Sequence, residues 1–158
     1  MWIKSRFWQR PAPGNLIANG GAESNMAGWL GRGNVDLDDS SPHSGDWSFL
    51  MDGAASFKTE RRDIDSESVF ALTLSFWAKV EDSRKARGRV WTKLANGQTK
   101  WKEIVISGTQ DWAFHSETFE YPHAVTKVEV RAPLEQKCDV VVKHLVCARW
   151  CRCKGSDQ

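Results

Sequence analysis

The chain is 158 residues long, enough for one domain that buries roughly two thirds of the surface exposed by its unfolded form. Its 22 basic and 20 acidic side chains leave a formal net charge of +2, which excludes the strong overall field that gathers nucleic acid or an anionic membrane. Nine tryptophans against one tyrosine form the strongest compositional bias, because indoles suit both a sandwich core and a stacking surface for ligands.

The first 14 residues predict an N-terminal arm. Four large apolar side chains are scattered among basic ones there: Trp2, Ile3, Phe7 and Trp8. Residues 11–14, Pro-Ala-Pro-Gly, cannot continue a helix and predict a stiff linker. Apolar side chains on a free tail would lie in water unless something covers them. Two interpretations stay open: the arm folds back over the domain, or its apolar residues dock on another subunit.

The cysteines are expected to be mostly free thiols. No apolar run matches a signal peptide or approaches the roughly 20 residues that span a bilayer, so we expect synthesis in a cytosol without export. Disulfides are rare in that compartment. Cys138 and Cys147 would lie about 30 Å apart on one strand, beyond disulfide reach. A zinc site formed by Cys147, Cys151 and Cys153 with Cys138 or His144 is an alternative, and chance clustering in a basic tail competes with it.

Residues 69–80, Val-Phe-Ala-Leu-Thr-Leu-Ser-Phe-Trp-Ala-Lys-Val, predict the central strand. Apolar side chains occupy every even position from Phe70 to Val80, and this period of two is typical of a strand with one buried face. A second layer must cover that face. The opposite parity carries Trp77, which either packs under another element or remains available to a ligand.

Further strands follow from the same alternation. They are expected at residues 47–53, 57–63, 89–94, 99–107, 125–131 and 139–147. Residues 95–98, Ala-Asn-Gly-Gln, predict a hairpin turn, because Asn-Gly tolerates the positive φ angles of such turns. Some nine or ten short strands without a convincing helix predict an all-β fold in which two antiparallel sheets pack as a sandwich.

From about residue 15 to residue 150 the sequence resembles the jelly-roll carbohydrate-binding modules found beside xylanases and glucanases, which are galactose-binding-like sandwiches. The resemblance depends on motifs in the same order: residues 15–23 (Asn-Leu-Ile-Ala-Asn-Gly-Gly-Ala-Glu), Gly28-Trp29, His43-Ser44-Gly45, residues 72–79 (Leu-Thr-Leu-Ser-Phe-Trp-Ala-Lys) and residues 112–122, which end in Thr-Phe-Glu-Tyr-Pro. It implies a β-sandwich domain over residues 15–150, preceded by the arm at 1–14 and followed by a basic, cysteine-containing tail at 151–158.

The resemblance also implies a structural calcium ion. Modules of this type often bind it through a turn near the start, here Asn19 to Ala22 with Glu23, and through an Asp in the last strand. This sequence has Lys143 and His144 where that Asp is expected. A lysine would repel the cation and could replace it by pairing with Glu23. No cofactor is therefore required, and calcium is an expectation that depends on the resemblance.

Tryptophans on predicted strands define a candidate ligand face. The residues are Trp77, Trp91 and Trp101, with Lys93 and Glu103 on the same parities as their neighbouring indoles. If these parities face outward, sugar rings could stack on the indoles while Lys93 or Glu103 fixes hydroxyl groups, which is how the family binds. The competing interpretation is that the arm or a neighbouring protein covers this surface.

Catalysis is not expected. His43 with Ser44 and His115 with Ser116 lack the context of a nucleophile and its base. Carboxylates are too frequent for a glycosidase pair to be recognised by spacing. Surface turn residues explain these positions.

The function expected first is that of a non-catalytic binding module on a bacteriophage capsid or tail. Small stand-alone sandwiches that resemble sugar-binding modules are familiar as accessory proteins of virus particles. The arm would attach the protein to a capsid or tail component, with glycans or further copies of the chain as additional partners and with no role for nucleic acid or a membrane. The alternative is a carbohydrate-binding module without virion attachment, which stacks sugar rings on surface tryptophans.

Overall fold

The computed structural model describes residues 16–17, 19, 23–24, 26–39, 45–64, 69–133 and 139–151. The predicted docking residues Trp2, Ile3, Phe7 and Trp8 lie outside these ranges, as do Cys138 and Cys153. Cys147 and Cys151 are described only as positions on a strand. The arm, the domain limits and the thiol predictions therefore stay predictions.

Seven strands make up the regular structure of the described residues, and every pairing between them is antiparallel. Their bounds are β1 (Trp29–Asp38), β2 (Ser48–Thr59), β3 (Arg62–Asp63), β4 (Val69–Leu94), β5 (Thr99–Glu120), β6 (Val125–Pro133) and β7 (Asp139–Cys151). No helix in the described part of the chain could cross a membrane. The predicted all-β, antiparallel fold is confirmed.

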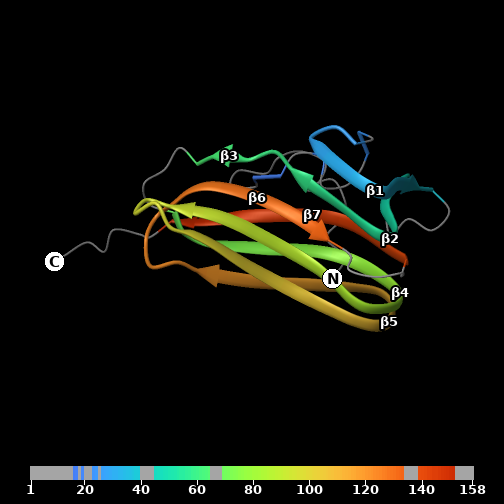
Figure 1. Cartoon of the computed structure of the whole chain (residues 1–158). Helices are drawn as coiled ribbons and strands as arrows, with labels where there is room; N and C mark the ends of the chain where they lie inside the picture. The colour runs from blue at the N-terminus through green and yellow to red at the C-terminus, as the bar shows by residue number, and fades with distance from the viewer. Residues whose placement is uncertain are drawn as a thin grey trace.

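Strands β4 and β5 form one long hairpin that folds over on itself (Figure 1). The first half of β4 pairs with β7 and its second half pairs with β6. Between the halves the β4–β5 register shifts repeatedly from Ala78 to Ala86, and Gly108 on β5 has a φ of 85°. A Cβ atom on Gly88 would come within 2.5 Å of the Phe76 ring, so the two halves of β4 lie face to face.

The folded hairpin contributes strands to both layers of a β-sandwich. We call the back sheet β1, β2, β7, the first half of β4 and the second half of β5; we call the front sheet β3, β6, the second half of β4 and the first half of β5. The front sheet faces the viewer in Figure 1. A short pairing of β2 with β6 joins the two sheets at one side.

The core lies between the two halves of β4. Its members include Leu72, Leu74, Phe76, Ala78 and Val80 from the first half and Ala86, Val90 and Leu94 from the second. The predicted parity is thus confirmed from residue 72 onward, but the prediction for Phe70 is wrong. Val69 is fully buried and Phe70 is half-buried, because the pairing with β7 shifts register between Val69 and Ala71.

The predicted number of strands is too high because several continue through bends. The predicted strands at 47–53 and 57–63 both overlap β2, and those at 69–80 and 89–94 both belong to β4. The predicted strand at 99–107 continues to Glu120 as β5 and takes in most of the motif at 112–122. Bulges keep the hydrogen-bonded ladder going while the strand turns a corner. At such a corner the alternation of apolar side chains breaks, and the break resembles a loop in the sequence.

The predicted hairpin turn between β4 and β5 is confirmed. Gly97 has a φ of 86°, the left-handed conformation that the motif requires. The Leu94 amide donates to the Gln98 carbonyl at 2.8 Å, and the Asn96 Oδ1 accepts from the Gln98 amide at 3.0 Å. This turn sets the β4–β5 register and therefore decides which side chains lie beside one another on the front sheet.

Candidate ligand-binding face

The outer surface of the front sheet is built from three parallel rows of side chains, each crossing β6, β4 and β5 in that order. The tryptophan row is Glu129, Trp91 and Trp101; the arginine row is Arg131, Arg89 and Glu103; the lysine row is Lys127, Lys93 and Thr99. Residues directly opposite each other in antiparallel strands share a face. We call these rows, with Lys58, Arg61, Asp63 and Arg87 at their borders, the front face.

The front face points away from the core. The residues that alternate with its rows are Val90 and Leu94 on β4 and Val128 and Val130 on β6, all at most 3% exposed. Because successive side chains of a strand point to opposite sides, the rows must point outward. The register thus brings together four of the five predicted ligand residues: Trp91, Trp101, Lys93 and Glu103.

Trp101 is the open aromatic side chain of this face. It is 42% exposed, and the guanidinium carbons of Arg89 and Arg131 lie 4.4 Å and 5.5 Å from its ring centre. Both arginines come from the arginine row, so they border Trp101 on the same side. Its other side is bordered by Thr99 and Lys93 of the lysine row. Cation–π contacts with the arginines hold the indole without covering it completely.

Trp91 does not form an open surface, contrary to the expectation. It is only 8% exposed, because the guanidinium of Arg61 lies over its ring at 4.2 Å. Arg61 comes from the segment between β2 and β3, far from Trp91 in sequence. Trp91 therefore acts as a packing surface beside Trp101.

A buried carboxylate organises the centre of the front face. Glu129 is 2% exposed and accepts hydrogen bonds from Arg61 Nε at 3.2 Å and Arg131 Nη2 at 3.0 Å, while Lys58 Nζ lies 3.8 Å away. Charge-assisted hydrogen bonds of this kind fix both partners in orientation. Glu129 thereby connects the arginine above Trp91 to an arginine beside Trp101.

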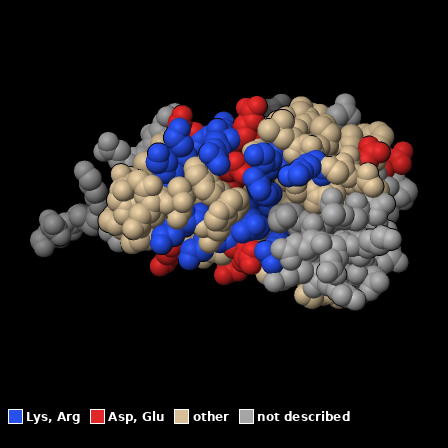
Figure 2. Space-filling view, viewed as in Figure 1, with Lys and Arg blue, Asp and Glu red and all other residues tan. Residues whose placement is uncertain are grey.

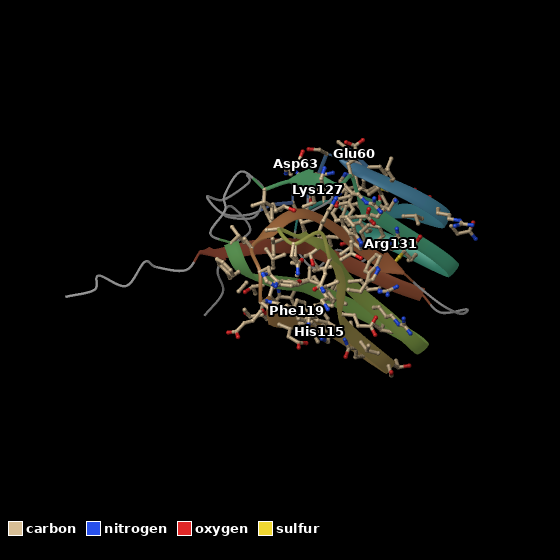
Figure 3. The ribbon with its side chains drawn as sticks, turned by 60° about the vertical axis from the view of Figure 1, so that its left-hand side comes forward. Glu60, Asp63, His115, Phe119, Lys127 and Arg131 are labelled. Atoms are coloured by element: carbon tan, nitrogen blue, oxygen red, sulfur yellow. The ribbon has the colours of Figure 1, made fainter. Side chains whose placement is uncertain are left out.

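Two further carboxylates pair with cations at the borders. Glu103 Oε2 lies 3.5 Å from Arg87 Nη1 and 3.3 Å from Arg89 Nε. Lys127 Nζ lies 2.9 Å from Asp63 Oδ1, and Figure 3 shows these two side chains together, with Arg131 farther along β6. Figure 2 shows the result on the surface: lysines and arginines form a broad basic band across this side of the molecule.

Trp77 does not belong to the front face, so the prediction of three indoles on one surface is wrong. Even-numbered residues of both halves of β4 point into the core, and the halves face each other. Their odd-numbered residues must therefore point to opposite sides of the sandwich. Trp77 lies on the outside of the back sheet, with its ring centre 5.4 Å from that of Phe114, which is 51% exposed.

Five residues of the two faces were not predicted from the sequence: Arg61, Arg89, Glu129 and Arg131 at the front, and Phe114 at the back. Phe114 could have been found from the hairpin turn and register alone, because it lies opposite Trp77. The cations and the buried glutamate gave no recognisable signal, since they are ordinary polar positions of alternating strands.

The residues predicted to bind calcium make structural hydrogen bonds. The Glu23 carboxylate accepts from the amides of Asp46 and Trp47 at 3.2–3.3 Å. Asn19 Oδ1 accepts from the Ser24 amide at 2.9 Å, and Asn19 Nδ2 donates to the Ala27 carbonyl at 3.0 Å. Within the described ranges no three or more His, Cys, Asp and Glu side chains form a metal-binding group. Calcium stays a prediction.

His115 and Ser116 do not form a catalytic pair. His115 lies opposite Phe76 on the inward side of β5 and its ring stacks on Phe76 at 5.5 Å, whereas Ser116 lies opposite Ser75 on the outward side. Burial lowers the pKa of His115 below its usual 6.5, and its Nε2 accepts a hydrogen bond from Gln110 Nε2 at 2.8 Å. Figure 3 shows His115 and Phe119 together, well away from Asp63 and Lys127. His43 and Ser44 lie outside the described residues.

No protein-family model and no curated protein sequence matches the chain. Several solved structures, in contrast, are similar to the chain. The chain is similar to a family 16 carbohydrate-binding module (TM-score 0.67, 21% identity, 85% of this chain and 99% of that one) and to the TmCBM61 module in complex with β-1,4-galactotriose (TM-score 0.60, 16% identity, 86% and 99%). It is also similar to the enzymatically active domain of bacteriophage CBA120 tailspike protein 4 (TM-score 0.69, 16% identity, 87% of this chain).

These likenesses establish a fold class: the β-sandwich of carbohydrate-binding modules. The chain spans 22% of the tailspike domain, so only part of that structure corresponds to it. The two modules correspond over nearly their whole length. Identities of 21% or less carry the fold and no specific ligand.

Proposed function

We propose that this protein is a non-catalytic carbohydrate-binding module whose ligand surface is the front face. The observation that carries the proposal is Trp101, an indole 42% exposed in the middle row of the front face, on strand β5, and bordered by Arg89 and Arg131. The likeness to two modules named for carbohydrate binding supports the same class of function.

The binding step follows from the geometry around Trp101. The apolar C–H side of a sugar ring would stack on the indole from the side bordered by Thr99 and Lys93, because the arginine row occupies the other side. Lys93 is exposed and could donate to ring hydroxyls. Because contacts with Arg89 and Arg131 hold the indole of Trp101 before binding, this side chain loses little ordering entropy.

The test is Trp101→Ala. Loss of one stacking ring should weaken binding to soluble polysaccharides by about 1–3 kcal/mol, by analogy with base stacking on aromatic side chains. Phe114→Ala is the matched control, because it removes a ring of similar exposure from the opposite side of the molecule. Affinity electrophoresis over a polysaccharide panel and near-UV circular dichroism would measure binding and folding. A folded Trp101→Ala protein that binds like the unmodified protein would refute the proposal.

Attachment to a bacteriophage capsid or tail is a second candidate function. The specific observation that favours it is the likeness to a bacteriophage tailspike domain. In this proposal the apolar residues of the arm, Trp2, Ile3, Phe7 and Trp8, dock on the particle. Deletion of residues 1–14 should then abolish co-sedimentation with particles while the melting temperature of the sandwich is kept. Retained co-sedimentation would remove the arm from the attachment.

A further inference from the structure

We infer that the front face takes an anionic polysaccharide, a chain whose repeating sugars carry carboxylate or sulfate groups. This inference rests on the proposed function and names the ligand class of the same face. It is carried by the charge of the face, which differs strongly from the near balance of the whole chain.

The face carries an excess of fixed positive charge. Six cations share three carboxylates in its ion pairs: Lys58, Arg61 and Arg131 on Glu129, Arg87 and Arg89 on Glu103, and Lys127 on Asp63. Lys93 adds a further cation between Lys127 and Thr99. With a formal net charge of only +2 over 158 residues, the surplus is concentrated on one side of the protein. Figure 2 shows this side.

The cations are positioned before any ligand arrives. Glu129 fixes Arg61 and Arg131 by hydrogen bonds, the ring of Trp91 lies beneath Arg61, and the ring of Trp101 lies against Arg89. A guanidinium has donors left over after one bond to a carboxylate, and its planar fork suits carboxylate and sulfate oxygens. Such preorganised donors favour anions at a small entropic cost.

The arrangement suits a polymer better than a single ion. Outward residues of one strand recur about every 6.7 Å, which is shorter than the Debye length of about 8 Å at physiological ionic strength. The electrostatic fields of the cations in the three rows therefore overlap and reinforce one another. A chain crossing the rows meets Lys93, then Trp101, then Arg89, so that a sugar ring can stack at the middle while charged groups on its neighbours meet cations on both sides.

A polysaccharide fits this face better than a nucleic acid does. Single-stranded nucleic acid is bound by successive aromatic side chains on which several bases stack. Here the second tryptophan of the row, Trp91, is 8% exposed beneath Arg61, which leaves Trp101 as the open ring of the tryptophan row.

The experiment compares matched charged and uncharged polymers. Full-length protein is titrated with polygalacturonate and with its fully methyl-esterified form, and in a second pair with dextran sulfate and dextran. We expect the charged member of one pair to bind at least about 10-fold tighter at low salt and this preference to shrink as salt rises, because the charges on the face are screened. The pair that shows the preference distinguishes carboxylate from sulfate.

Two variants locate the effect. Lys93→Gln should reduce the preference for the charged polymer by about 3-fold or more, since it removes a cation beside Trp101. Lys79→Gln is the control, because it removes the same charge from the first half of β4, outside the front face, and should leave the preference within about 2-fold.

The outcomes separate the two proposals. Equal affinity for charged and uncharged members of both pairs would overturn the inference and leave the proposed function intact. If the protein binds none of these four polymers and none of the polysaccharides in the panel used for Trp101→Ala, both the inference and the proposed function are overturned. Single-stranded DNA that binds as tightly as polygalacturonate at equal charge concentration would overturn the assignment to a polysaccharide.

Discussion

The two halves of the β4–β5 hairpin offer a direct comparison, because the same pair of strands forms part of both outer faces. In the back half, Thr73 lies opposite Thr118 with their Oγ1 atoms 2.7 Å apart, and Trp77 lies beside Phe114. In the front half, the corresponding positions carry Trp91, Trp101, arginines and Glu103. Both halves bury an apolar parity in one shared core, so the difference concerns only the outward side chains.

The comparison shows how a sheet can separate folding from binding. The inward side chains meet at the centre, where Gly88 leaves room for Phe76. The outward side chains carry no such constraint, and they differ in kind. The back has neutral hydroxyls and an aromatic pair, with the charged residues Lys79 and Glu120 towards its ends, whereas the front has ion-paired charges around an indole. A ligand that distinguishes the two faces must therefore respond to charge as well as to aromatic contact.

The largest expected effect is on the charge network of the front face. Glu129→Ala removes the buried acceptor of Arg61 and Arg131, and loss of one partner of a buried ion pair costs about 3–5 kcal/mol. Because Arg61 is 60% exposed, we expect the lower end of that range. Thr118→Ala at the back removes one exposed hydroxyl contact and should cost no more than about 1 kcal/mol. Urea denaturation measures both.

Equal free energies of unfolding for Glu129→Ala and Thr118→Ala would contradict the view that the hydrogen bonds of Glu129 stabilise the fold. Glu129→Gln separates charge from shape, because the amide keeps one acceptor. If Glu129→Gln is as destabilised as Glu129→Ala, the negative charge is the essential part.

An effect of similar size distinguishes covered from open aromatic side chains. Trp91→Ala should cost about 3 kcal/mol in stability, the range of a buried Trp truncation, because Trp91 is 8% exposed under Arg61. Phe114→Ala at the back should cost about 1 kcal/mol or less, since half of that ring already lies in water. Thermal unfolding followed by circular dichroism measures both. A stable Trp91→Ala protein would mean that Trp91 is available to a ligand after all.

Local alternation was sufficient to predict the core parity of β4 but not its path through the fold. Leu72, Leu74 and Phe76 follow a period of two, and any two-layered solution must bury them. The corner at residues 81–85 has no such pattern, and it decides whether Trp77 and Trp91 share a side. Because β4 folds over at this corner, the odd-numbered residues of its two halves point to opposite sides of the molecule. Four of the predicted ligand residues therefore meet on the front face, and Trp77 lies on the back.

Glu129 is buried by residues that are distant from it in the sequence. In the sequence Glu129 stands in an ordinary alternation of valines and charged residues, on the polar parity. It is buried because Arg61, 68 residues away, hydrogen-bonds to it from the segment that follows β2. Contacts at such separations depend on the order of strands in the sheet, and local propensity carries no information about that order.

The smallest expected effect is a pH dependence of stability that comes from the back half of β5. Burial against Phe76 lowers the pKa of His115 below 6.5, so the unfolded chain binds a proton more readily than the folded one. Stability from this source is complete above about pH 6.5 and is lost as the pH falls from there towards the folded-state pKa. Protonation would also remove the acceptor for Gln110. The melting temperature should therefore fall between pH 7 and pH 5.5, and less so in His115→Gln. An identical fall in both proteins would assign the dependence to other groups, and the ion pairs of the front face would then be the next to test.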